Sequence, residues 1–141
     1  MSNLLIGKVI NDTRIASDQQ AILFVCNNGE QLVARVDGDC CCSYSWIENI
    51  EMPALGFPFT ILSIDDLDLP GSDDNHPEHD CLQVYGAKII TDKGEMIIDY
   101  RNASNGYYGG NMVWPDDEDS YFYGGVHGQN VSNENWQPIT E

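Results

Sequence analysis

Residues 82–101 read LQVYGAKIITDKGEMIIDYR, two apolar segments joined by the turn Asp92-Lys93-Gly94. Two sets of side chains alternate in the second segment: Met96, Ile98 and Tyr100, and between them Ile97, Asp99 and Arg101. A period of two places the two sets on opposite faces of a β-strand, and a short glycine-containing turn joins antiparallel strands. These residues therefore predict a β-hairpin in which Arg101 lies on the face opposite Met96.

The rest of the first two thirds shows the same kind of pattern. Ala21–Cys26 and Gln31–Val36 flank the turn Asn27-Asn28-Gly29, which predicts a first hairpin. Further strands are expected at Leu4–Ile10 and Phe57–Ile64, and a last, aromatic strand near Tyr107–Trp114. The sequence thus predicts a mostly antiparallel β-sheet.

One segment between the strands favours a helix. Ser43 can cap residues 44–50, in which Trp46, Ile47 and Ile50 would share one helical face, and Pro53 would end the helix. The expected fold class is α+β: an antiparallel sheet with hairpins and one short helix packed on it. We expect a single domain over residues 1–141, with an acidic loop at 65–80 and a weakly patterned tail at 128–141.

The charge balance limits the possible partners. Asp and Glu total 23 against 6 Lys and Arg, so the formal net charge is -17. Such a field repels duplex DNA and anionic membranes, and no apolar run is long enough to span a membrane. We expect a cytoplasmic protein with its five cysteines reduced. Solubility explains strong acidity in most proteins; imitation of nucleic acid, to occupy a basic groove of another protein, remains an alternative.

Residues 101–110, RNASNGYYGG, concentrate the groups that a nucleotide-like ligand needs. They hold one guanidinium, two carboxamides, two phenols and three glycines, in a chain with only six cationic side chains. Glycine N–H groups can approach a phosphate closely, and tyrosine rings can stack on a base. A tight, solvated turn between two strands is the competing interpretation.

No motif indicates catalysis or a resident metal. Cys40, Cys41 and Cys42 lack the paired Cys-x-x-Cys spacing, and we interpret them as small buried hydrophobes. Zinc held by His76, His79 and Cys81 with one distant cysteine is a weaker alternative. The aspartates of 65–74 do not fit a calcium loop, and no hydrolase or phosphate-loop motif is present. The prediction is a protein without catalytic residues, metal or cofactor.

Two motifs together carry a family resemblance: Gly38-Asp39-Cys40-Cys41 followed by Ser43-x-Ser45-Trp46-Ile47-Glu48, and the segment 101–110. In this order they resemble the first-described Thoeris anti-defence sponge family of phages, over about Leu4–Val113. The chain departs from the family in Cys42 and in the acidic insertion around 65–80.

The resemblance implies a phage protein that acts in the host cell cytoplasm as a sink. It would capture the cyclic ADP-ribose-type messenger of a TIR-domain immune enzyme, and some similar proteins also capture cyclic oligonucleotides. Family members are oligomers with pockets at subunit interfaces, so we expect at least a homodimer, with no nucleic acid or membrane as partner. The ligand contacts carried over are Arg101, Asn102, Ser104, Asn105, Gly106, Tyr107, Tyr108 and Gly109.

Overall fold

A computed structural model describes residues 4–37, 43–70, 81–104, 111–115 and 135–139. Within these ranges the chain forms nine β-strands and no helix, hence none that could cross a membrane. The strands are β1 (Val9–Ala16), β2 (Ala21–Cys26), β3 (Gln31–Asp37), β4 (Ser43–Glu51), β5 (Phe59–Leu67), β6 (Cys81–Thr91), β7 (Gly94–Ser104), β8 (Asn111–Val113) and β9 (Trp136–Pro138).

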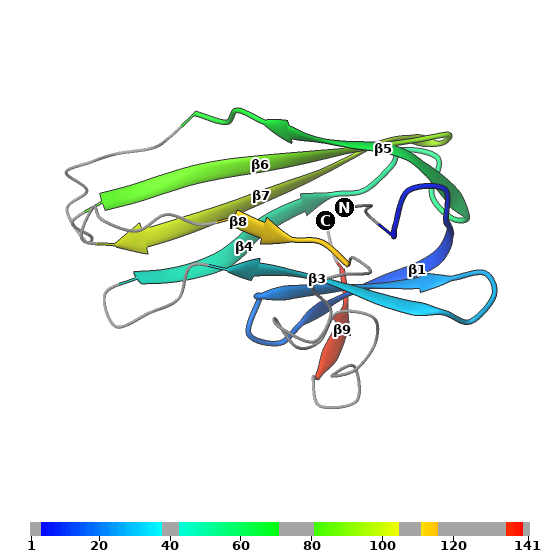
Figure 1. The fold of residues 1–141 in the computed structure, drawn as a ribbon, viewed down its shortest axis with the longest axis horizontal. Coiled ribbons are helices and arrows are strands. Elements are labelled where there is room, and N and C mark those ends of the chain that lie inside the picture. The colour runs from blue at the N-terminus through cyan, green and yellow to red at the C-terminus, as the bar shows by residue number, and fades with distance from the viewer. Residues whose placement is uncertain (1–3, 38–42, 71–80, 105–110, 116–134, 140–141) are drawn as a thin grey trace.

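All nine strands belong to one antiparallel sheet. They pair in the order β4-β7-β6-β5-β1-β2-β3-β8, and β9 pairs with β1 off this path. Figure 1 shows a first layer of β4, β7, β6 and β5, and a second layer of β1, β2 and β3. The layers are joined where β5 meets β1 through the pairs Val9↔Thr60 and Ile10↔Phe59. Because this junction is short, the sheet can fold over and bury an apolar face of each layer.

The main core draws buried side chains from both layers. The largest fully buried members are Phe24, Phe59, Leu5, Ile10, Ile22, Leu32, Ile47, Ile61, Ile89, Met96 and Ile98. A second cluster of Ala16, Ala21, Leu23 and Val33 lies apart from it, with Trp136 packed against it. The expected tail at 128–141 thus includes a short strand, β9, whose first residue covers apolar side chains of the second layer.

Both predicted hairpins are present. β2 and β3 pair around Gly29, and β6 and β7 pair along eleven residue pairs up to Gly94. Each of these glycines has a positive φ, 88° and 122° respectively, which a residue with a side chain rarely adopts. Met96, Ile98 and Tyr100 face the core, as the alternation predicts.

The expected helix is wrong, and with it the α+β class: the described fold is all-β. Residues 43–51 form strand β4, which pairs with β7 along its length. The register shifts between Ile47 and Asn49, so that Glu48 is an extra residue in the strand. This β-bulge places Ile47 and Ile50 on the same buried face although they are three positions apart, a spacing that imitates a helix.

Two other boundaries differ from expectation. The strand expected at Leu4–Ile10 shares only Val9 and Ile10 with β1, which instead continues through polar residues to Ala16, whereas residues 4–8 precede the strand. β5 continues to Leu67, so the first residues of the expected acidic loop belong to the sheet, with Asp65 opposite Lys88. Carboxylates are tolerated there because that end of β5 is exposed.

Candidate ligand-binding surface on strands β4 and β7

The two sequence motifs meet in the sheet. Ser43, the first residue of β4, pairs with Ser104, the last residue of β7, and Ser104 also pairs with Cys81 at the start of β6. The segments 38–42, 71–80 and 105–110 are therefore attached at adjacent positions of one sheet end. Those segments lie outside the described residues, and with them the predicted contacts Asn105, Gly106, Tyr107, Tyr108 and Gly109, as well as Cys40, Cys41, Cys42, His76 and His79.

Arg101 lies on the outer face of the first layer, directly opposite Trp46 of β4. Its Nε donates to Asp99 Oδ1 at 3.3 Å and its Nη2 donates to Asp99 Oδ2 at 3.2 Å. These bonds raise the pKa of Arg101, and the negative charge of Glu48 raises it further. The guanidinium is therefore held in a fixed orientation while 30% of the side chain is exposed.

Tyr44 and Trp46 form an aromatic shelf next to Arg101. Their rings stack with centroids 5.7 Å apart and an interplanar angle of 22°, and Tyr44 is 50% exposed. Trp46 Nε1 donates to Glu48 Oε1 at 2.8 Å, which fixes the indole. We call Tyr44, Trp46, Glu48, Asp99 and Arg101 the β4–β7 outer surface.

Sequence reasoning missed Tyr44 because residues 44–50 were expected to be helical. In a helix, positions 44 and 46 do not lie on the same face. In a strand they do, so the aromatic-x-aromatic spacing is the signal that would have found the shelf once β4 was assigned.

Asn102 belongs to the opposite face. Its side chain is fully buried, and its Nδ2 donates to Ser45 Oγ at 2.9 Å. The pair links β4 to β7 inside the protein, on the face away from Arg101. Asn102 is therefore separated from the β4–β7 outer surface, and Ser104 is located only as the residue that ends β7.

The chemistry of the β4–β7 outer surface suits a planar ring next to one anionic oxygen. A guanidinium has five N–H donors, of which Asp99 accepts from two, so three can serve a ligand. Glu48 and Asp99 leave the surface with a small negative charge, which disfavours a polyanion bound to these side chains alone. Phosphate binding there requires further donors, such as the backbone N–H groups of a glycine-rich segment.

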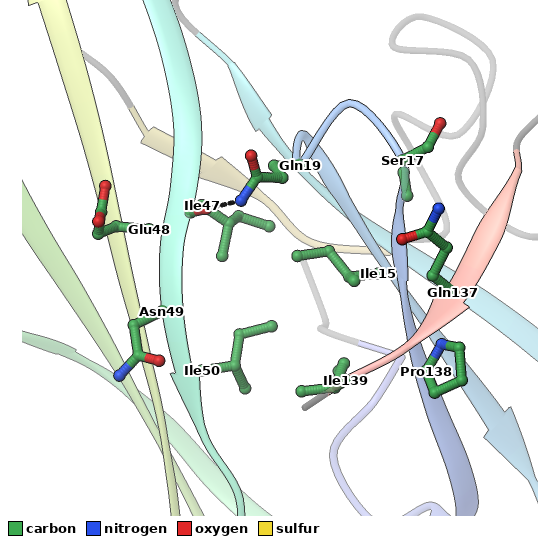
Figure 2. A pocket seen from close by; sticks show the side chains of 11 residues that line it. Ile15, Ser17, Gln19, Ile47, Glu48, Asn49, Ile50, Gln137, Pro138 and Ile139 are labelled. Atoms are coloured by element: carbon green, nitrogen blue, oxygen red, sulfur yellow. Dashed lines mark hydrogen bonds between the residues drawn. The ribbon is translucent and has the colours of Figure 1, made fainter. Parts of the chain in front are cut away.

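A groove of about 420 Å³ lies on the other side of β4, between this strand, β1 and β9. Figure 2 shows Ile47 and Ile50 pointing toward Ile15 and Ile139, whereas Glu48 points away from them. At the rim Ile47 N donates to Gln19 O at 2.7 Å, and Gln19 Nε2 donates to Ile47 O at 3.4 Å. These bonds hold the edge of β4 against the β1–β2 turn and so position the shelf on its outer face.

The described residues hold no group of three His, Cys, Asp or Glu side chains that could bind a metal ion. Comparison with curated proteins and with solved structures found no match. A family defined as "Domain of unknown function (DUF7448)" matches residues 3–114, which include β1 to β8 and both motifs. The chain therefore belongs to the DUF7448 family.

Proposed function

We propose that the protein is a phage anti-defence sponge that binds and sequesters the cyclic ADP-ribose-type messenger of a TIR-domain immune enzyme, and so keeps the effector inactive. The observation that supports this most is the pairing of Trp46 with Arg101 on one exposed face, at the sheet end where the segment 105–110 begins. The aromatic shelf and the guanidinium thus lie on β4 and β7, and the chain continues from the end of β7 into the glycine-rich residues that gave rise to the hypothesis.

Each part of this ligand has a matching group. The purine would stack on Tyr44 and Trp46. An oxygen of one phosphate would accept a hydrogen bond from Arg101, and an oxygen of the other phosphate would accept hydrogen bonds from backbone N–H groups of residues 106–110. Binding without chemistry suffices for a sink. In this proposal the protein is a binder in the host cytoplasm, and it needs no metal or cofactor.

Affinity argues for more than one subunit. A sponge must hold a scarce signal, which requires a roughly nanomolar dissociation constant. This corresponds to a binding free energy of about -12 kcal/mol. Tight pockets enclose about 70–90% of a ligand's surface, whereas an open sheet face covers one side of it. We therefore propose that a second copy of the chain closes the site.

The direct test is capture and release. Purified protein is incubated with the product of a TIR enzyme, filtered and heat-denatured, and the released small molecules are analysed by mass spectrometry. Recovery of intact messenger supports sequestration. Failure to recover any messenger contradicts the proposal, and recovery of a product of altered mass would identify a hydrolase.

Matched variants locate the site. Arg101→Ala should weaken binding by about 1.5 to 3 kcal/mol through loss of a charged hydrogen bond, and Trp46→Ala by about 1 to 3 kcal/mol through loss of stacking. Arg14→Ala is the control, because Arg14 forms the same kind of pair with a carboxylate two residues earlier, Asp12, at 3.0 Å. Equal effects at Arg14 and Arg101 would remove the β4–β7 outer surface from the proposal.

A nucleic-acid mimic is the second candidate. The carboxylates Asp65 and Asp66 at the end of β5 and Asp68 just beyond it are exposed, and the chain carries a net charge of -17. A complex of this kind with a DNA-binding protein should weaken steeply with added salt. Capture of a partner that survives neutralisation of these three carboxylates would exclude their involvement.

A further inference from the structure

A second cavity, of about 460 Å³, lies on the inner face of the first layer, where β8 approaches β6 and β7. Three aromatic side chains line it, from three different strands or strand ends: Tyr85, Tyr100 and Trp114. The lining also has two carboxylates, Asp66 in β5 and Asp68 just beyond it, and its other members are Leu67, Val84, Gly86 and Met112. We call the three aromatic residues and the two carboxylates the aromatic pocket.

The rings form a fixed wall. Tyr85 and Tyr100 are direct cross-strand partners, and their rings stack with centroids 5.3 Å apart and an interplanar angle of 15°. Tyr85 Oη donates to Gln83 Oε1 at 2.7 Å, which holds its phenol in place. Tyr100 is buried, so the wall is part of the folded core and is not a surface cluster.

The carboxylate of Asp66 faces the same side of the sheet as this wall. Asp66 pairs with Ala87, which is buried on the core face, whereas its neighbour Asp65 pairs with Lys88 on the opposite face. Burial raises the pKa of Tyr100, and the negative charge of Asp66 on the same face raises it further. Among the described residues no lysine or arginine forms an ion pair with Asp66 or Asp68.

We propose that the aromatic pocket binds a small organic cation with an alkylated ammonium group. Tyrosine and tryptophan faces attract such cations through the ring quadrupole, and the uncompensated carboxylates add Coulomb attraction. An alkylated ammonium fits better than a bare one, since a bare ammonium is strongly hydrated and loses more on entering an aromatic site. The same carboxylates repel a phosphate, so this site is distinct from the one proposed on the β4–β7 outer surface.

The test is calorimetric titration with choline and tetramethylammonium, compared with dimethylbutanol, the neutral isostere of choline. Both cations should bind, and the neutral isostere should bind at least about tenfold more weakly, as loss of the cation–π and Coulomb attraction requires. No binding of either cation, or equal binding of dimethylbutanol, would overturn the proposal. The second result would instead identify an apolar or base-binding pocket.

A matched pair of variants assigns the site. Asp66→Asn and Asp65→Asn remove the same charge from adjacent exposed residues on opposite faces of β5. Asp66→Asn should weaken choline binding several-fold and Asp65→Asn by less than about twofold. Equal weakening by both would show a response to net charge only and would contradict the pocket. Both positions are exposed, so we expect both variants to fold. The comparison therefore does not need a variant such as Trp114→Leu, which would remove one wall of the pocket and could prevent folding.

Discussion

Arg101 and Asn102 are adjacent in β7, yet they serve different purposes. Arg101 lies on the outer face with Asp99, whereas Asn102 lies in the core with Ser45. The period of two in a strand causes this separation. The first two residues of the segment 101–110 therefore differ in role: Arg101 belongs to the exposed surface, and Asn102 forms a hydrogen bond inside the protein.

Substitutions at these two positions should have separable effects. Asn102→Ala should lower the free energy of unfolding by about 1 to 3 kcal/mol, because it leaves the buried Ser45 hydroxyl without the amide that donates to it. Arg101→Ala should lower it by less than about 1 kcal/mol, because its ion pair is partly exposed. Urea denaturation of both variants gives the comparison. A larger loss for Arg101→Ala than for Asn102→Ala would contradict the assignment of faces.

Tyr100 should make stability depend on alkaline pH. Burial, followed by the charge of Asp66, raises its pKa to about 12 from an ordinary value of 10.0. The folded state thus holds the proton more tightly than the unfolded chain. Its contribution is complete below pH 10, falls as pH rises through about 12, and amounts to about 2 to 3 kcal/mol.

Urea denaturation between pH 9 and pH 12 measures this slope. Tyr100→Phe should flatten it, because the variant has no phenol at this buried position. An unchanged slope in Tyr100→Phe would assign the alkaline transition to other groups.

At the scale of elements, β4 is the segment that sequence patterns describe least well. Its two isoleucines are three positions apart, as on a helix, because the bulge at Glu48 inserts one residue between them. Pairing with the distant strand β7 makes this segment a strand and not a helix, because the pairing satisfies the backbone hydrogen bonds of β4 and buries both isoleucine side chains. The hairpins β2–β3 and β6–β7 were predictable, because each combines a period of two with a local glycine turn.

Deletion of Glu48 tests the bulge. The shortened strand would keep Ile47 and Ile50 on the core face in regular alternation, so we expect a folded protein that loses about 1 kcal/mol, partly through the missing acceptor of Trp46 Nε1. Deletion of Trp46 is the control: it moves Glu48 to a core position and should prevent folding. Thermal denaturation followed by circular dichroism measures both. Similar losses in the two variants would argue against the bulge.

The whole molecule combines a net charge of -17 with a few local ion pairs. Repulsion between carboxylates opposes the compact state, and salt screens it within a Debye length of about 10 Å at 0.1 M. The midpoint of thermal unfolding should therefore rise as sodium chloride increases from millimolar levels to about 0.1 M. A midpoint that falls would mean that the ion pairs outweigh the repulsion.

If a second copy of the chain closes the proposed site, the protein is an oligomer whose interface covers the first residues of β4. Light scattering should give a mass of at least twice the 15.7 kDa of one chain. Tyr44→Asp should favour the monomer, because Tyr44 lies on the surface that a second copy would cover. Leu55→Asp, at a residue that is 74% exposed beyond the other end of β4, should leave the assembly intact. A monomeric wild type, or dissociation by Leu55→Asp alone, would contradict the shared site.

The sequence by itself determined the antiparallel strands and turns of the two hairpins, since period-two alternation and glycine conformations are local properties. It also placed Arg101 opposite the Met96 face. Only the tertiary structure decided that residues 43–51 are a strand, that Trp46 lies opposite Arg101, and that Asn102 is buried with Ser45, 57 positions away. It alone brought Tyr85, Tyr100 and Trp114 around one cavity. These arrangements depend on which strands pair and on a one-residue bulge, and neither leaves a local signal in the chain.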